Sequence, residues 1–209
     1  MSSVDLLLLI VSSPSGAGKT TLTRRLLKQF PELTFSVSHT TRKRRPTEVD
    51  GKDYQFVDRP TFEAMVERNE FAEWAEVHGN LYGTSKGQLD RAREEGMHGI
   101  VFDVDHQGAR QIHAAFPHAV GVFILPPSMP ELLSRLRRRA EDDEATIRRR
   151  YQKALYEIEH YPFFDYIVVN EELERADAML QGIVYAERSR RWRAAGLAEQ
   201  LLRAQPMPE

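Results

Sequence analysis

The chain opens with a short run of apolar residues, Leu6 to Val11, which ends at a Ser-Pro-Ser-Gly cluster. An apolar run of this length, closed by turn-forming residues, is typical of a strand buried on both faces, as the strands of parallel sheets usually are. The run is too short for a membrane span or an export signal. We therefore expect the chain to enter its core with this first strand.

Helical spacing and further apolar runs then alternate along the chain. Leucines recur at helical spacing from Thr20 to Phe30, and Pro31 ends that pattern. Further strands are expected at Gly99 to Val104, Ala119 to Leu125 and Tyr166 to Val169, with helices at Ser85 to Glu95 and within Leu173 to Ala204. Strands that alternate with helices predict a parallel sheet.

Two stretches depart from this alternation. The segment from Phe35 to about Gly87 is rich in Thr, Arg and aromatic residues and contains short alternating runs such as Tyr54 to Val57. With one helix expected at Thr61 to Arg68, it predicts a small mixed module inserted between core elements. The second stretch, Glu131 to Tyr161, is helical and highly charged, and its pattern alone indicates a solvated helical hairpin.

Composition limits the kinds of partner that the chain can have. Its 209 residues suffice for one α/β core with a smaller inserted module but are few for two independent domains. A hydrophobic content of 41%, a charged content of 29% and a net charge of −2 give no overall bias toward nucleic acid or membranes. The absence of cysteine removes disulfides and thiolate chemistry and favours a cytoplasmic location.

A glycine-rich segment between the first strand and the first helix carries the strongest chemical signal. It consists of Ser13, Pro14, Ser15, Gly16, Ala17, Gly18, Lys19 and Thr20, and it matches the Walker A pattern except that Ser13 replaces the first glycine. The glycines let successive backbone N–H groups face an anion at the positive end of the following helix. Lys19 would neutralise the β and γ oxygens of a nucleoside triphosphate, and the Thr20 hydroxyl would reach magnesium. The alternative is a plain glycine turn between a strand and a helix.

A carboxylate at the end of a second apolar strand extends this hypothesis. The run Ile100 to Phe102 leads into Asp103, and the carboxyl ends of parallel strands meet at one edge of a sheet. Asp103 is therefore a candidate to hold the water shell of the metal ion. The pattern alone is weak, because a carboxylate at a strand end also serves as a cap.

Several further segments closely resemble those of guanylate kinases, in the same order and at the same spacing from the glycine loop. They are Ser36 to Pro46, Glu48 to Val57, Phe71 to Ser85, Asp103 to Ala109 and Ile167 to Asn170. With the arginines of the helical hairpin, the resemblance extends to about Arg188. The chain departs from the residues usual in that family at Leu81, His106 and Ala140, none of which is assigned to chemistry.

The resemblance implies an α/β fold with a P-loop kinase core, whose parallel five-stranded sheet is flanked by helices, an inserted mixed α/β GMP-binding module and a helical lid. The implied boundaries are 1–36, 96–127 and 162–209 for the core, 37–95 for the GMP-binding module and 128–161 for the lid. The implied activity is transfer of the γ-phosphoryl group of ATP to GMP, giving ADP and GDP, with Mg²⁺ as cofactor and with no nucleic-acid or membrane partner. The number of subunits stays open.

The resemblance also implies roles for individual residues. By the family pattern, the acceptor phosphate is held by Arg42, Arg45, Tyr54 and Tyr82, and the guanine base is read by Ser38, Glu73, Thr84 and Asp105, with Asp103 also at the GMP site. Asn170 binds ATP together with the loop residues. The charge of the transferred phosphoryl group is neutralised by five basic residues: Lys19, Arg42, Arg135, Arg139 and Arg150. This division suits GMP, because a guanidinium group can hold two phosphate oxygens and a carboxylate complements the N1–H and N2–H₂ donors of guanine.

Each of these residues also has a simpler interpretation. The run Arg42 to Arg45 could be a solvated turn or a nucleic-acid patch, Glu73 a carboxylate on a surface helix, and the two tyrosines packing residues. Two other functions are open for the whole chain: a non-catalytic interaction module, and a kinase for another phosphorylated acceptor such as a ribose bisphosphate. The intact Gly18-Lys19-Thr20 sequence argues against the first, and Glu73 with its polar neighbours argues against the second.

Overall fold

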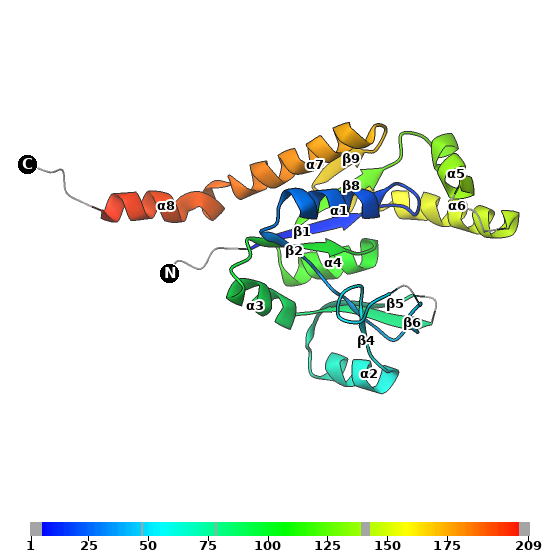
Figure 1. Ribbon diagram of the computed structural model, residues 1–209, viewed down its shortest axis with the longest axis horizontal. Helices are drawn as coiled ribbons and strands as arrows, with labels where there is room; N and C mark the ends of the chain where they lie inside the picture. Colours follow the sequence, from blue (N-terminus) through cyan, green and yellow to red (C-terminus); the bar gives the residue numbers. More distant parts are fainter. Residues whose placement is uncertain (1–5, 47, 78, 139–142, 205–209) are drawn as a thin grey trace, which may run out of the picture.

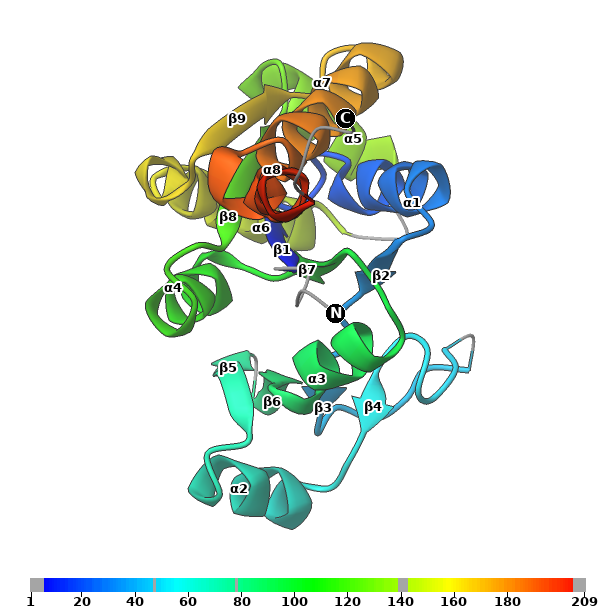
Figure 2. The ribbon, with the colours of Figure 1, turned by 90° about the vertical axis from the view of Figure 1, so that its left-hand side faces the viewer.

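Two β-sheets form the framework of the chain (Figures 1 and 2). The computed structural model describes residues 6–46, 48–77, 79–138 and 143–204. The larger sheet has five strands in the order β2-β7-β1-β8-β9, and all neighbours run parallel. These strands are β1 (Leu7–Ser12), β2 (Leu33–Phe35), β7 (Gly99–Asp103), β8 (Val120–Leu125) and β9 (Tyr166–Val169). The prediction of a parallel five-stranded sheet is confirmed.

Helices cover both faces of the larger sheet, as Figure 2 shows. One face packs against α1 (Lys19–Gln29) and α7 (Leu173–Arg188), and the other against α3 (Gly87–Glu94) and α4 (His106–Ala115). Leu7 and Leu9 of β1 belong to the first hydrophobic cluster, whereas Leu8 and Ile10 belong to the second. The apolar run of β1 is unbroken because both faces of this central strand are removed from water.

The smaller sheet has four strands in the order β4-β3-β6-β5 and lies below the larger sheet in Figure 1. Its strands are β3 (His39–Thr40), β4 (Gln55–Phe56), β5 (Phe71–Val77) and β6 (Asn80–Ser85), and α2 (Arg59–Glu67) packs against them. Phe62 of α2 stacks on Phe71, with ring centroids 4.4 Å apart. A register shift between Phe71 and Glu73 interrupts the β5-β6 ladder. This bulge allows Phe71, Ala72 and Glu73 all to be buried, although strand side chains normally alternate.

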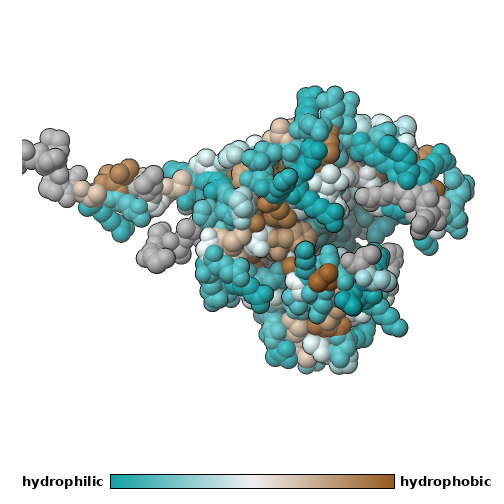
Figure 3. Space-filling view, viewed as in Figure 1, coloured by the Kyte–Doolittle hydropathy of each residue, from teal (hydrophilic) through white to brown (hydrophobic). Residues whose placement is uncertain are grey.

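A helical hairpin stands beyond the carboxyl end of β1, at the right of Figure 1. It consists of α5 (Met129–Arg138) and α6 (Glu144–Ile158), which bury leucine, isoleucine and alanine side chains against each other. On its exposed side, Arg137 pairs with Glu144 at 2.8 Å and Arg138 with Glu131 at 3.1 Å. Figure 3 shows that this end of the molecule is mainly hydrophilic. The predicted charged hairpin is confirmed.

The C-terminal part begins with the short 3₁₀ helix η1 (Tyr161–Phe163), followed by β9 and α7. A final helix, α8 (Arg191–Arg203), extends away from the rest of the chain (Figure 1). Among the described residues, no helix is both long and apolar enough to cross a membrane. The helices and strands that were predicted lie within about three residues of the observed ones. Strand β2 was missed, because three residues that follow Pro31 and Glu32 show no periodicity. Helix α4 and strands β3, β5 and β6 were not predicted individually either.

Candidate functional site

The loop between β1 and α1 curls in the way that a phosphate-binding loop requires. Gly18, which precedes α1, has a φ of 98°. Residues other than glycine rarely adopt this backbone conformation. A Cβ at this position would lie 2.2 Å from Nδ2 of Asn170. That amide donates to the Ala17 carbonyl at 2.7 Å, so Asn170 fixes the loop from the end of β9. The N–H groups at the start of α1 therefore converge on one point, where an anion is favoured.

Lys19 and Asp103 meet at the adjoining ends of β1 and β7. Nζ of Lys19 forms an ion pair with the Asp103 carboxylate and donates to the Val104 carbonyl at 3.3 Å. The side chain of Asp103 is 23% exposed, and Thr20 is exposed on the first turn of α1. The structure thus brings together the loop and the strand-end carboxylate that the sequence paired. Within the described part of the chain, no group of three or more His, Asp or Glu side chains could itself hold a metal ion.

The helical hairpin closes over the loop and brings two of the predicted arginines to it. Arg150 donates to the Ser15 hydroxyl at 3.1 Å. Arg135 donates to the Asn170 carbonyl at 3.0 Å and pairs with Glu131 at 2.8 Å. The third predicted arginine, Arg139, and its neighbour Ala140 lie outside the described residues.

One acidic residue of the hairpin also reaches the loop. Glu157 accepts a hydrogen bond from the Ser15 N–H at 3.1 Å, and its carboxylate lies 3.7 Å from Nζ of Lys153. A cavity of about 260 Å³ lies here, lined by loop residues together with Asp105 and Glu157. The Glu157 carboxylate thus accepts the hydrogen bond of an N–H group that could otherwise donate to a bound anion.

A basic and aromatic cluster lies on the smaller sheet. The Arg42 guanidinium holds the Glu48 carboxylate with two hydrogen bonds of 2.7 and 3.1 Å, and this contact raises the pKa of Arg42. Its Cζ lies 5.4 Å from the centre of the Tyr54 ring, which in turn lies 6.0 Å from the Tyr82 ring. Burial raises the pKa of Tyr54. Arg45 differs, because its side chain is exposed and its hydrogen bond to the cluster comes from the backbone N–H, which donates to Glu48 at 2.7 Å.

The predicted base-reading residues lie close together around β5 and β6. Glu73 of β5 pairs with Thr84 of β6, Ser38 before β3 contacts Thr84, and Asp105 before α4 lies near Glu73. Glu73 is only 5% exposed and Thr84 is 0% exposed. Thr84 faces two serine hydroxyls, that of Ser38 at 3.4 Å and that of Ser36 at 3.5 Å. The interpretation of Glu73 as a surface-helix carboxylate is wrong, since this residue lies buried on a strand.

The Glu73 carboxylate faces the N-terminus of α4. A Cβ at Gly108, in the first turn of α4, would lie 2.9 Å from its Oε2 atom, so a larger residue there would force the Glu73 carboxylate to shift. Asp105 caps the same helix, accepting from the N–H groups of Gln107 and Gly108 at 3.0 and 3.1 Å. Burial raises the pKa of Glu73 to about 7, with a further rise from the negative charge of Asp105, while hydrogen bonds from Thr84 oppose both.

Three residues of this site were not predicted from the sequence. Ser36 lay two positions from Ser38, which places both on one face of an extended chain and was a usable signal. Glu48 and Glu157 gave none, because each acts through contacts that only the folded chain creates.

The fold and the loop together define the class of the protein. The central strand of the parallel sheet leads through a glycine loop into a helix, and the loop lysine lies beside the carboxylate of the neighbouring strand. This is the arrangement of P-loop nucleotide-binding proteins.

Comparison with known proteins narrows this class to one family. The family model for guanylate kinase matches residues 6–187. The guanylate kinase of Rhizobium meliloti (strain 1021) is 50% identical over 194 residues, covering 92% of this chain and 88% of that protein. The guanylate kinase of Myxococcus xanthus (strain DK1622) is 51% identical over 188 residues, covering 90% of each chain. A crystal structure of guanylate kinase from Anaplasma phagocytophilum superposes with a TM-score of 0.77 at 34% identity and covers 100% of both chains. The chain belongs to the guanylate kinase family.

The buried carboxylate leads to a prediction about stability. The pKa of Glu73 is about 7 in the folded chain, above the ordinary value of 4.5, so its contribution to stability is present at low pH and is lost as the pH rises through 7. Glu73→Gln removes the charge, so we expect this variant to gain stability over the parent, on the order of 2 kcal/mol, at pH 8.5 but not at pH 4.5. Urea unfolding at both values measures the difference.

The matched control is Glu76→Gln, which changes an exposed carboxylate on the same strand. We expect its effect on the free energy of unfolding to be the same at both pH values. An equal effect of Glu73→Gln at pH 4.5 and 8.5 would show that the Glu73 carboxylate is not held out of water.

Proposed function

We propose that this chain transfers the γ-phosphoryl group of ATP to GMP, giving ADP and GDP, with Mg²⁺ bound at the loop. The observation that carries the proposal is the buried Glu73 carboxylate, which faces hydroxyl groups and lies beside the same strand-end segment that meets the phosphate-binding loop. A carboxylate beside hydroxyl groups complements the N–H donors and the O6 acceptor of a guanine base. The family relatives support the same activity, since they are named guanylate kinases.

The proposal divides the chain into three working parts. Residues 1–36, 96–127 and 162–209 form the P-loop core, 37–95 bind GMP, and 128–161 act as the lid. Separate hydrophobic clusters in the smaller sheet and in the helical hairpin support this division. A part with its own core can move as a unit, and closure over the substrates would exclude water, which otherwise accepts the phosphoryl group.

The loop supplies the donor site in this proposal. Residues Ser13 to Thr20 and Asn170 surround the phosphates of ATP, with Lys19 on the β and γ oxygens. The oxygen donors of Thr20 and Asp103 suit Mg²⁺, which prefers oxygen ligands and keeps most of its waters. Mg²⁺ would neutralise charge on the transferred group. Asp103 would hold the ion through its water shell.

The acceptor site holds the phosphate of GMP with Arg42, Arg45, Tyr54 and Tyr82. The second pKa of a phosphate monoester is near 6, so the attacking oxygen is largely ionised at neutral pH and no general base is required. Catalysis then depends on aligning two anions and neutralising their charge. Arg42, Arg135, Arg139 and Arg150 provide that charge together with Lys19. Arg42 must exchange its contact with Glu48 for the phosphate.

Guanine is read at the other end of the acceptor site. Glu73 accepts from N1–H and N2–H₂, while the hydroxyls of Ser38 and Thr84 face O6, and Asp105 completes the set. Adenine presents an acceptor at N1 and donors at N6, which is the wrong pattern. A ribose bisphosphate would offer the buried carboxylate no N–H donors beyond the hydrogen bonds from Thr84, and an incompletely paired buried charge is costly. This contrast favours GMP over the other kinds of phosphorylated acceptor.

A coupled assay with ATP, Mg²⁺ and each of GMP, AMP, CMP and UMP tests the proposal. Among the four acceptors, we expect only GMP to support efficient formation of ADP. Equal rates with AMP, or no transfer to any of the four, would refute the proposed activity.

Lys19→Ala should lower kcat by at least about 100-fold in a folded variant, because the lysine stabilises charge that develops during transfer.

The contact of Glu157 with the loop leads to a separate prediction. Because its carboxylate accepts from the Ser15 N–H, it competes with the phosphates of ATP for that group and repels them. We expect Glu157→Gln to lower the KM for ATP about fivefold, corresponding to about 1 kcal/mol, with the KM for GMP unchanged. Steady-state kinetics measure both constants. Glu159→Gln, an exposed change on the same segment, is the control. A raised KM for ATP in Glu157→Gln would mean that the carboxylate assists binding.

A further inference from the structure

Two glutamine side chains form paired hydrogen bonds with the backbone beside the residues proposed to read guanine. We call each such pair of hydrogen bonds a clamp. Gln88 accepts from the Val37 N–H at 2.9 Å and donates to the Val37 carbonyl at 2.6 Å. Gln111 does the same at Trp74, accepting from its N–H at 3.0 Å and donating to its carbonyl at 2.7 Å. Each side-chain amide therefore pairs with one whole residue, as a neighbouring strand would.

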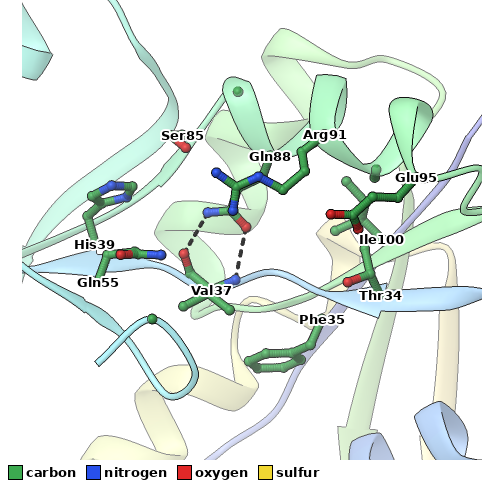
Figure 4. A pocket seen from close by; sticks show the side chains of 13 residues that line it. Thr34, Phe35, Val37, His39, Gln55, Ser85, Gln88, Arg91, Glu95 and Ile100 are labelled. Atoms are coloured by element: carbon green, nitrogen blue, oxygen red, sulfur yellow. Dashed lines mark hydrogen bonds between the residues drawn. The ribbon is translucent and has the colours of Figure 1, made fainter. Parts of the chain in front are cut away.

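The first clamp lies on the segment that joins β2 to β3. Val37 belongs to neither strand, so no sheet ladder fixes it. Gln88, on the first turn of α3, takes that role, as Figure 4 shows. Val37 lines a cavity of about 420 Å³ on one side of the extended segment, whereas its neighbours Ser36 and Ser38 face Thr84 on the other side. Holding Val37 therefore sets where both serine hydroxyls lie.

The second clamp lies on β5, an edge strand of the smaller sheet. Trp74 pairs with Gly83 on one side, and its backbone groups on the open edge meet Gln111 of α4. It directly follows Glu73, next to the bulge where the ladder loses register. A strand is least well fixed at such a point. Gln111 therefore ties the strand that carries Glu73 to the helix whose N-terminus Glu73 faces.

We propose that Gln88 and Gln111 are positioning residues for recognition of the guanine base. The inference rests on the proposed function, because it assigns to these glutamines the task of holding the residues that bind GMP. A side-chain amide suits this task, since it offers one acceptor and one donor without a charge. Polar groups that read a ligand must be held to within about half an ångström by their surroundings.

The two clamps control different atoms of the base. Gln88 positions the Ser38 hydroxyl, which faces O6 in the proposed complex. Both GMP and IMP carry this oxygen. Gln111 holds Glu73, which accepts from N2–H₂, and IMP lacks that amino group. Loss of the first clamp should therefore weaken both nucleotides equally. Loss of the second should weaken GMP more than IMP and reduce the preference between them.

The test uses Gln88→Met and Gln111→Met, which keep the length of the side chain but remove both hydrogen bonds. Steady-state kinetics with GMP, IMP and ATP are measured on variants shown by thermal melting to be folded. We expect the KM for GMP to rise about 10-fold in each variant, with kcat and the KM for ATP within about twofold of the parent. The GMP-to-IMP ratio of kcat/KM should fall about fivefold in Gln111→Met and stay within twofold in Gln88→Met.

The control is Gln29→Met, an exposed position on α1, which should leave every constant unchanged. If a methionine variant fails to fold, the corresponding glutamate variant, which keeps the acceptor for the N–H group, is measured in its place.

Three results would overturn the inference. One is a KM for GMP within threefold of the parent in both folded variants. Another is an equal loss for GMP and ATP, which indicates general loosening. The third is an unchanged GMP-to-IMP ratio in Gln111→Met. A parent protein that binds no GMP in calorimetry refutes the proposed function itself, and with it this inference, before any variant is compared.

Discussion

The burial of one carboxylate imposes the strongest constraint on this structure. A charged group away from water is costly unless polar partners surround it. Around Glu73 the chain supplies hydrogen bonds from Thr84 on the facing strand, and Gly108 in the first turn of α4 leaves space for the carboxylate. These partners do not restore the ordinary pKa of the carboxyl, which burial raises to about 7. A ligand with two N–H donors can offset the remaining free-energy cost of keeping this carboxylate charged away from water.

The same segment that faces Glu73 also serves the phosphate-binding loop. Asp103 ends β7 and pairs with Lys19, and two residues later Asp105 caps α4, whose first turn touches Glu73. The turn between β7 and α4 therefore connects the glycine loop to the surroundings of Glu73 within a few residues of chain. In the proposed reaction, this link sets the distance between donor and acceptor, which a transfer between two anions requires.

What the sequence could predict was whatever depends on neighbouring residues. The buried strands, the glycine loop and the charged hairpin each have a local pattern, and the structure contains all three. Strand β2 has no such pattern, because it exists only through its pairing with β7. The contacts of Glu157 with the loop and of Gln111 with Trp74 join distant parts of the chain, and no spacing in the sequence foretold them. Family resemblance pointed to Glu73, but only the fold shows that it is buried.

Titration of the Glu73 carboxyl carbon by NMR, with and without GMP, tests the central claim most directly. The signal is assigned by its loss in Glu73→Gln. We expect a pKa near 7 in the free protein, as burial dictates, and a fall of at least about one unit when GMP binds, since donors from guanine favour the charged form. An ordinary pKa near 4.5 in the free protein, or a value that GMP leaves unchanged, would contradict the role of this carboxylate as the reader of guanine.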